Sequence, residues 1–199
     1  MGNGPGTERG ANLTGRLLVA TPSEGGGVFA RSVVLLLHHG DDGAQGVILN
    51  RPLAADVDVV LPGWGRLAVG PPTLYQGGPV APDSALGLTT VRDVGSAPPG
   101  VRRLVEGSLL VGGTGLVDLD IEPLDLLGVV DGVRIFAGYA GWGQGQLEAE
   151  ISDGAWYVVD AEAGDVLTRH NDRLWATVLA RQGGALAMVA FFPADPNWN

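Results

Sequence analysis

The residues with the most chemical promise lie between Gly138 and Ile151, in the sequence G-Y-A-G-W-G-Q-G-Q-L-E-A-E-I. A predicted strand runs here into four glycines and then into the start of a predicted helix. Free backbone N–H groups and the helix dipole at such a start can bind an anion. The spacing is not that of a dinucleotide-binding fingerprint, and the chain has no P-loop Lys-Ser or Lys-Thr pair. We favour the alternative, a tight turn whose glycines let Tyr139 and Trp142 pack closely.

Two carboxylates follow on the predicted helix, and their spacing separates them. At about 100° per residue, Gln146 and Glu150 lie beside each other, whereas Glu148 lies roughly 200° from Gln146. Glu148 and Glu150 therefore do not share a face, and a glycosidase-type pair is not expected from these two alone. Either could act singly or cap backbone, and we favour a structural role for both.

The histidines give weak support for a metal site. His38 and His39 are adjacent at the end of a predicted strand, so their side chains point to opposite faces of the sheet. The third histidine, His170, is far away in the sequence. A three-histidine zinc site would need both neighbours, and we therefore expect no metal. A histidine bonded to a backbone carbonyl in the core is the simpler interpretation.

An Asn-Arg-Pro sequence follows the next predicted strand. Asn50 and Arg51 could face a cleft, where the guanidinium could bind a carboxylate or phosphate through two hydrogen bonds. Alternatively, Asn50 caps a turn and Arg51 pairs with a surface acid. Pro52 stiffens the segment, and the two interpretations remain open.

The composition excludes several function classes. The 199 residues include 33 Gly and 13 Pro but no Cys, and all 12 basic residues are Arg. Thiol catalysis, disulfides, Schiff-base chemistry and a Walker lysine are therefore excluded, and no cofactor is expected. The net charge of −10 opposes binding to nucleic acid or to an anionic membrane. No apolar run is long enough to span a membrane and no export signal is present, so we expect a cytoplasmic protein.

The elements that must position these residues are mostly short strands. Strands are expected at 15–20, 32–37, 45–49, 73–76, 85–91, 101–105, 108–111, 133–138 and 156–160, and helices at 56–61, 120–127, 146–152 and 172–182. Because steady strand–helix alternation is missing, we predict a compact α+β domain with a largely antiparallel, barrel-like sheet and flanking helices. This domain would span 13–190, after a disordered leader at 1–12 and before an irregular tail at 191–199.

Four blocks of sequence resemble the YqgE/AlgH family of bacterial proteins. They are F-A-R-S-V-V-L-L-L-H-H (29–39), G-A-Q-G-V-I-L-N-R-P (43–52), Y-Q-G-G-P-V (75–80) and the block from Gly138 to Ile151 followed by Trp156. The third block adds Gly77, Gly78 and Pro79 to the candidate residues. The order of the blocks makes the resemblance specific, and it extends from Gly15 to Trp175.

The resemblance implies a cytosolic α+β protein and supplies no catalytic residue. One member of the family is named as a regulator of alginate production, and the description "transcriptional regulator" spread from it. This chain departs from the family pattern at His38, where members usually have an acidic residue, and it lacks the Cys that some members carry. The acidic charge and the absence of a helix-turn-helix pattern argue against direct DNA binding.

Three functions follow from these observations. The first is a non-enzymatic regulatory or adaptor protein that binds a protein or a small ligand at a cleft lined by glycine and aromatic residues. The second is a hydrolase- or transferase-type enzyme that uses Glu148 or Glu150 with His39 and Arg51. The third is a nucleic-acid-linked regulator. The predicted ligand- or partner-binding residues are His39, Asn50, Arg51, Gly77, Gly78, Pro79, Tyr139, Gly141, Trp142, Gly143, Gln146, Glu148 and Glu150.

Overall fold

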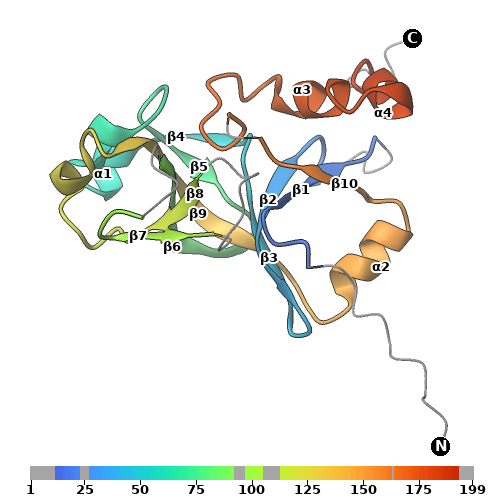
Figure 1. The fold of residues 1–199 in the computed structure, drawn as a ribbon, viewed down its shortest axis with the longest axis horizontal. Helices are drawn as coiled ribbons and strands as arrows, with labels where there is room; N and C mark the ends of the chain where they lie inside the picture. Colours follow the sequence, from blue (N-terminus) through green and yellow to red (C-terminus); the bar gives the residue numbers. More distant parts are fainter. Residues whose placement is uncertain (1–11, 23–26, 92–96, 105–112, 163, 193–199) are drawn as a thin grey trace, which may run out of the picture.

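The computed structural model describes residues 12–22, 27–91, 97–104, 113–162 and 164–192 (Figure 1). Within these ranges the chain forms ten strands, four short α-helices and two 3-10 helices. The strands are β1 (Arg16–Ala20), β2 (Val33–Gly40), β3 (Gly43–Ile48), β4 (Pro52–Asp56), β5 (Thr73–Gln76), β6 (Val80–Val91), β7 (Val101–Arg103), β8 (Thr114–Val117), β9 (Val130–Trp142) and β10 (Trp156–Asp160). The helices are α1 (Val57–Val60), η1 (Trp64–Leu67), η2 (Pro123–Leu126), α2 (Gln146–Ser152), α3 (Leu174–Ala180) and α4 (Gly184–Val189).

The strands form one sheet that curls into a half-barrel. Its main path runs β10-β1-β2-β3-β9-β6-β8-β7, and β4 and β5 attach to it through β9. The pairings are antiparallel except that of β5 with β9, which is parallel. In Figure 1, α3 and α4 lie together at one side of the sheet and α2 lies near β10. The predicted α+β class is confirmed. None of the described helices is long and apolar enough to cross a bilayer.

The sheet strands β1 and β2 are buried on both faces. Leu17, Val19 and Leu35 face a cluster that includes Trp175 and Val178 of α3. The intervening residues of the same strands face a second cluster, which includes Leu147 of α2 and the indoles of Trp142 and Trp156. Burial on both faces explains why these strands appear in the sequence as continuous apolar runs rather than as alternating patterns.

A buried arginine crosses the centre of the fold. Arg134 of β9 is 2% exposed, and its guanidinium lies 4.2 Å from the centre of the Tyr75 ring. It donates to the backbone carbonyls of Leu49 and Thr168, and so ties β9 to two connecting segments. Burial lowers the pKa of Arg134 to about 10, which still leaves the group charged at neutral pH. The cation–π contact and the two carbonyls partly replace the water that the guanidinium has lost.

Candidate functional site

A glutamate at the centre of the glycine-rich block holds two tryptophans. Oε2 of Glu150 accepts hydrogen bonds from Nε1 of Trp142, at 2.8 Å, and from Nε1 of Trp156, at 2.9 Å. Its Oε1 accepts from Nε2 of Gln146 at 2.9 Å, while Oε1 of Gln146 accepts from the backbone N–H of Gly143 at 3.0 Å. The carboxylate thus joins the end of β9, helix α2 and the start of β10. These contacts use Glu150 for structure rather than for chemistry.

The other glutamate of α2 contacts a histidine. Oε1 of Glu148 lies 2.9 Å from Nε2 of His39, whose side chain is only 8% exposed. Nδ1 of His39 accepts from the backbone N–H of Leu13 at 3.2 Å. Because a backbone N–H can only donate, Nδ1 carries no proton, and Nε2 therefore donates to Glu148. Both ring nitrogens are engaged, so His39 has no free lone pair to act as a base.

The Asn-Arg-Pro residues brace a neighbouring loop. Oδ1 of Asn50 accepts from the N–H of Val33 at 3.0 Å, and its Nδ2 donates to the carbonyl of Arg31 at 3.0 Å. Arg51 donates to the carbonyl of Ala30. Of the two interpretations left open by the sequence, the turn-bracing role of Asn50 therefore fits the structure. The partner of Arg51 is a carbonyl rather than a surface acid.

The braced loop reaches the tryptophan pair. The ring of Phe29 lies 5.4 Å from that of Trp156 and 6.2 Å from that of Trp142, measured between ring centres. Further along the loop, the guanidinium of Arg31 lies 3.9 Å from the centre of the Trp175 ring. The backbone of Arg31 has a φ of 52°, in the left-handed region that L-residues rarely occupy. The loop therefore links the Asn-Arg-Pro segment to the glycine-rich block.

The Gly-Gly-Pro turn packs directly on the backbone of β9. A Cβ added to Gly78 would overlap backbone atoms of Tyr139 and Ala140, and one added to Gly77 would overlap the carbonyl of Gly138. Only glycine allows two backbones to come this close. The turn is followed by Ala81, whose φ is 46°. Such strain in a residue other than glycine is often found beside functional sites.

A cleft of about 380 Å³ opens where these segments meet. It is lined by His38, Asp42, Gly43, Ala44, Gln45, Val80, Tyr139, Gly141 and Trp142. The β2–β3 hairpin forms one wall, and the end of β9 with the start of β6 forms the other. Backbone pairing fixes the walls, because Gln45 lies opposite Gly141 and Val80 lies opposite Tyr139.

A histidine–aspartate pair stands at the edge of this cleft. Nε2 of His38 lies 2.8 Å from Oδ1 of Asp42, across the hairpin turn. The hydrogen bond from His38 is the main cause that lowers the pKa of the Asp42 carboxyl below its usual value. No Ser, Thr, Cys or Lys lines the cleft. Among the residues that the structure describes, no three His, Asp or Glu side chains gather as metal ligands would.

The structure divides the predicted site residues into two groups. Tyr139, Gly141 and Trp142 line the cleft directly. The remaining predicted residues do not line it: His39, Asn50, Arg51, Gly77, Gly78, Pro79, Gly143, Gln146, Glu148 and Glu150. Within the proposed enzyme set, His39 meets Glu148, while Glu150 and Arg51 are engaged with other partners.

Sequence reasoning missed six lining residues, which are His38, Asp42, Gly43, Ala44, Gln45 and Val80. Gln45 and Val80 lie inside the quoted blocks, so their position in the sequence was a usable signal. For His38 and His39, alternation predicts opposite faces but does not say which face is exposed. The structure exposes 51% of the His38 side chain and buries His39.

The fold and the cleft define a class of protein, a curled antiparallel α+β domain in which glycine-rich turns gather aromatic side chains. A sequence model of the AlgH-like family matches residues 17–187, and the chain belongs to this family. A UPF0301 protein of Streptomyces coelicolor is 53% identical over 192 residues, which cover 95% of this chain and 96% of that protein.

Two solved structures share the fold. The crystal structure of a protein from Corynebacterium diphtheriae superposes with a TM-score of 0.82 and 33% identity, over 94% of this chain and 95% of the other. The solution structure of the AlgH protein from Pseudomonas aeruginosa gives a TM-score of 0.64 and 26% identity, over 95% and 98% of the two chains. The resemblance inferred from the four sequence blocks is thereby confirmed.

Proposed function

We propose that this chain is a non-enzymatic, cytoplasmic regulatory or adaptor protein that binds its partner at the cleft between the β2–β3 hairpin and the end of β9. One observation carries the proposal: all four sequence blocks contribute to the lining of this cleft. His38 comes from the first block, Gln45 from the second, Val80 from the third, and Tyr139 and Trp142 from the fourth. Segments distant in the sequence have been brought together around one small space.

The lining is better suited to binding than to catalysis. Trp142 is fixed from behind by Glu150, and the Gly-Gly-Pro turn holds Val80 against β9. Rigid aromatic side chains lose little conformational entropy when a partner binds, and they dominate the energy of many interfaces. The partner, a protein segment or a small ligand, would place an apolar or aromatic group against Tyr139, with hydrogen bonds to Gln45 at the rim.

Photo-cross-linking in the cells that make this protein tests the proposal. A benzophenone amino acid would replace Gln45, which is exposed and lines the cleft. The matched control would carry the same group at Arg173, whose exposed side chain lies at the start of α3. We expect an adduct at position 45 that is absent at 173 and that is lost when Tyr139→Ala is added.

Mass spectrometry of the adduct would distinguish a protein partner from a small ligand. Identical adduct patterns at positions 45 and 173, or no adduct at either, would contradict the proposal. Thermal unfolding of the Tyr139→Ala protein provides the control for folding, since an unfolded variant would lose its adduct for an unrelated reason.

A further inference from the structure

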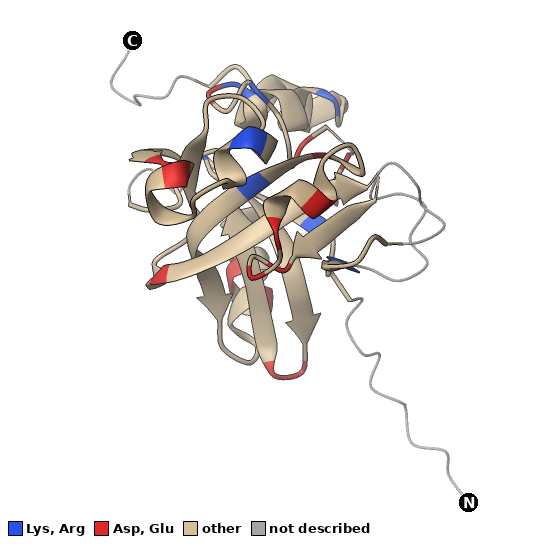
Figure 2. Cartoon of the chain, turned by 90° about the vertical axis from the view of Figure 1, so that its left-hand side faces the viewer, with Lys and Arg blue, Asp and Glu red and all other residues tan. Residues whose placement is uncertain are grey.

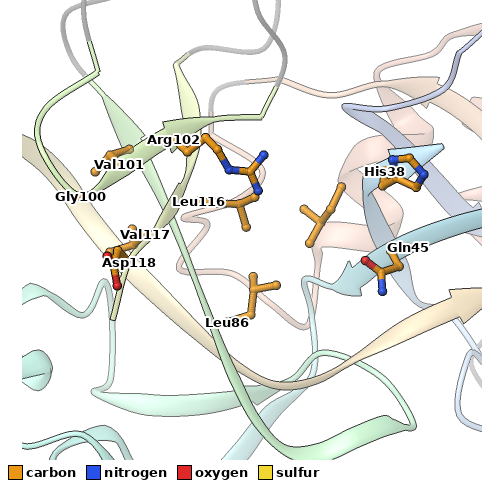
Figure 3. Close-up of a pocket in the computed structure, with 10 residues that line it drawn as sticks. His38, Gln45, Leu86, Gly100, Val101, Arg102, Leu116, Val117 and Asp118 are labelled. Carbon is orange, nitrogen blue, oxygen red and sulfur yellow. The ribbon is translucent and has the colours of Figure 1, made fainter. Parts of the chain in front are cut away.

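The structure has a second and larger cleft. Its volume is about 740 Å³, which is within the usual range for small-molecule sites. It is lined by Leu37, His38, Gln45, Leu86, Gly100, Val101, Arg102, Leu116, Val117 and Asp118. Strands β7 and β8 form one wall and the β2–β3 hairpin the other (Figure 3).

A guanidinium points into this cleft without an acidic partner. Arg102 forms no ion pair with any residue in the described part of the chain, although the protein carries a net charge of −10. In Figure 3 its side chain extends away from Asp118 and toward the wall formed by His38 and Gln45. The carboxylate of Asp118 is engaged elsewhere, since its Oδ1 accepts from the backbone N–H of Asp120 at 3.0 Å. Arg102 is thus available to bind an anionic group through two parallel hydrogen bonds.

Three leucine side chains line the same cleft as the guanidinium. Leu37, Leu86 and Leu116 are half-buried and pack against the core cluster beneath the cleft. On the far wall, Gln45 presents an amide, and His38 presents an imidazole whose Nε2 faces Asp42. A ligand that reaches from Arg102 across the leucines would therefore have a charged end and an apolar body.

We propose that this cleft binds a small amphipathic carboxylate, with Arg102 holding its anionic end and the three leucines holding its apolar body. Asp118 lines the same cleft, and its carboxylate disfavours ligands with several negative charges, such as nucleoside triphosphates. The inference goes beyond the proposed function, because the site lies apart from Tyr139 and Trp142. The two clefts share His38 and Gln45, so a ligand in one would contact the hairpin that borders the other.

Purified protein and defined probes test this inference. The fluorescence of 8-anilinonaphthalene-1-sulfonate, an aromatic anion, would report occupancy, and octanoate would be titrated as the competing carboxylate. 1-Octanol, which has the same chain without the charge, and ATP, a polyanion, are the ligand controls. We expect octanoate to displace the dye, and 1-octanol and ATP to be weaker competitors by about 10-fold or more.

Two arginine variants locate the site. Arg102→Gln removes the guanidinium and should weaken octanoate binding by about 10-fold, with little effect on 1-octanol. Arg173→Gln makes the same change in net charge on the exposed start of α3 and should leave octanoate binding within about 2-fold. Thermal unfolding confirms that both variants are folded.

Three results would overturn the inference: no displacement of the dye by octanoate, equal displacement by octanoate and 1-octanol, or unchanged octanoate binding in Arg102→Gln. None of these measurements involves a cellular partner. Failure here is therefore distinguishable from failure of the cross-linking experiment at Gln45.

Discussion

A single carboxylate, Glu150, determines how the two tryptophans of the glycine-rich block are held. It accepts from both buried indoles, which have no other acceptor among the described residues. Glu150→Ala would leave two donors unsatisfied inside the protein. Because a buried hydrogen bond to a charged group contributes about 1.5–3 kcal/mol, we expect this variant to lower the free energy of unfolding by about 2–4 kcal/mol. Urea unfolding followed by circular dichroism measures the loss.

The neighbouring glutamate is the matched control. Glu148→Ala removes one contact from a side chain that is 53% exposed, and its partner His39 keeps the hydrogen bond from Leu13. We expect a loss of about 1 kcal/mol or less. Equal losses from the two variants would show that Glu150 does not have the bracing role assigned to it.

Arg134 offers a second test at this scale. Arg134→Lys keeps the charge, but an ammonium group lacks the planar fork that reaches the carbonyls of Leu49 and Thr168. We expect a loss of about 2–4 kcal/mol in unfolding free energy. The control is Arg16→Lys, since Arg16 is 38% exposed and pairs with Asp160 at the surface. If both lysine variants unfold at the same urea concentration, the buried guanidinium is not specifically required.

The unfolding of the two lysine variants should be measured near pH 7, because burial changes the pKa of Arg134. Burial lowers its folded pKa to about 10, below the ordinary pKa of an arginine, so the folded protein releases this proton first as the pH rises. The unfolded state then binds more protons between those two values, and the contribution of Arg134 makes stability rise with pH there. Below about pH 10 the group is charged in both states, and the variants compare contacts alone.

At the residue level, the sequence indicated some of the residues that line the cleft but not the role of each residue. The four blocks named Tyr139, Gly141 and Trp142, which do line the cleft. The blocks could not show that Glu150 would be engaged by two indoles from different strands, because such contacts depend on tertiary packing. Of the two adjacent histidines only His39 was among the predicted residues, and alternation along a strand leaves open which of the two side chains is exposed.

At the level of elements, the close approach of the Gly-Gly-Pro turn to β9 decides the shape of the cleft. Gly78→Ala would force a methyl group into the backbone of Tyr139 and Ala140, where no side chain can move aside. We expect a loss of more than about 3 kcal/mol, or an insoluble protein. Gly164→Ala is the control, because a Cβ there meets nothing within 4 Å. A Gly78→Ala protein as stable as the Gly164→Ala protein would contradict the packing described.

Several helices and strands could be predicted from the local sequence alone. The predicted ranges 73–76, 146–152 and 156–160 coincide with β5, α2 and β10. Pro52 is the first residue of β4, a position that needs no ladder N–H. Strand β9 continues to Trp142 through the predicted glycine bend, because β3 pairs with it there. The strand predicted at 108–111 lies outside the described residues.

At the scale of the whole molecule, charge bears on the description "transcriptional regulator" associated with the family. The chain has 22 acidic and 12 basic residues, and Figure 2 shows acidic and basic positions interspersed on several separate elements. Binding to duplex DNA requires several arginines or lysines on one face to neutralise phosphates and release counterions. Several arginines here already have partners inside the protein, including Arg134 and Arg181.

We therefore expect no retardation of duplex DNA or single-stranded RNA in gel-shift experiments, even at low salt, where electrostatic binding is strongest. A basic DNA-binding protein run in parallel shows that the assay detects such binding. A shifted band that weakens as salt is added would contradict this expectation and support direct nucleic-acid regulation. Its absence, together with an adduct at Gln45, would mean that any effect on transcription passes through a partner bound by this protein.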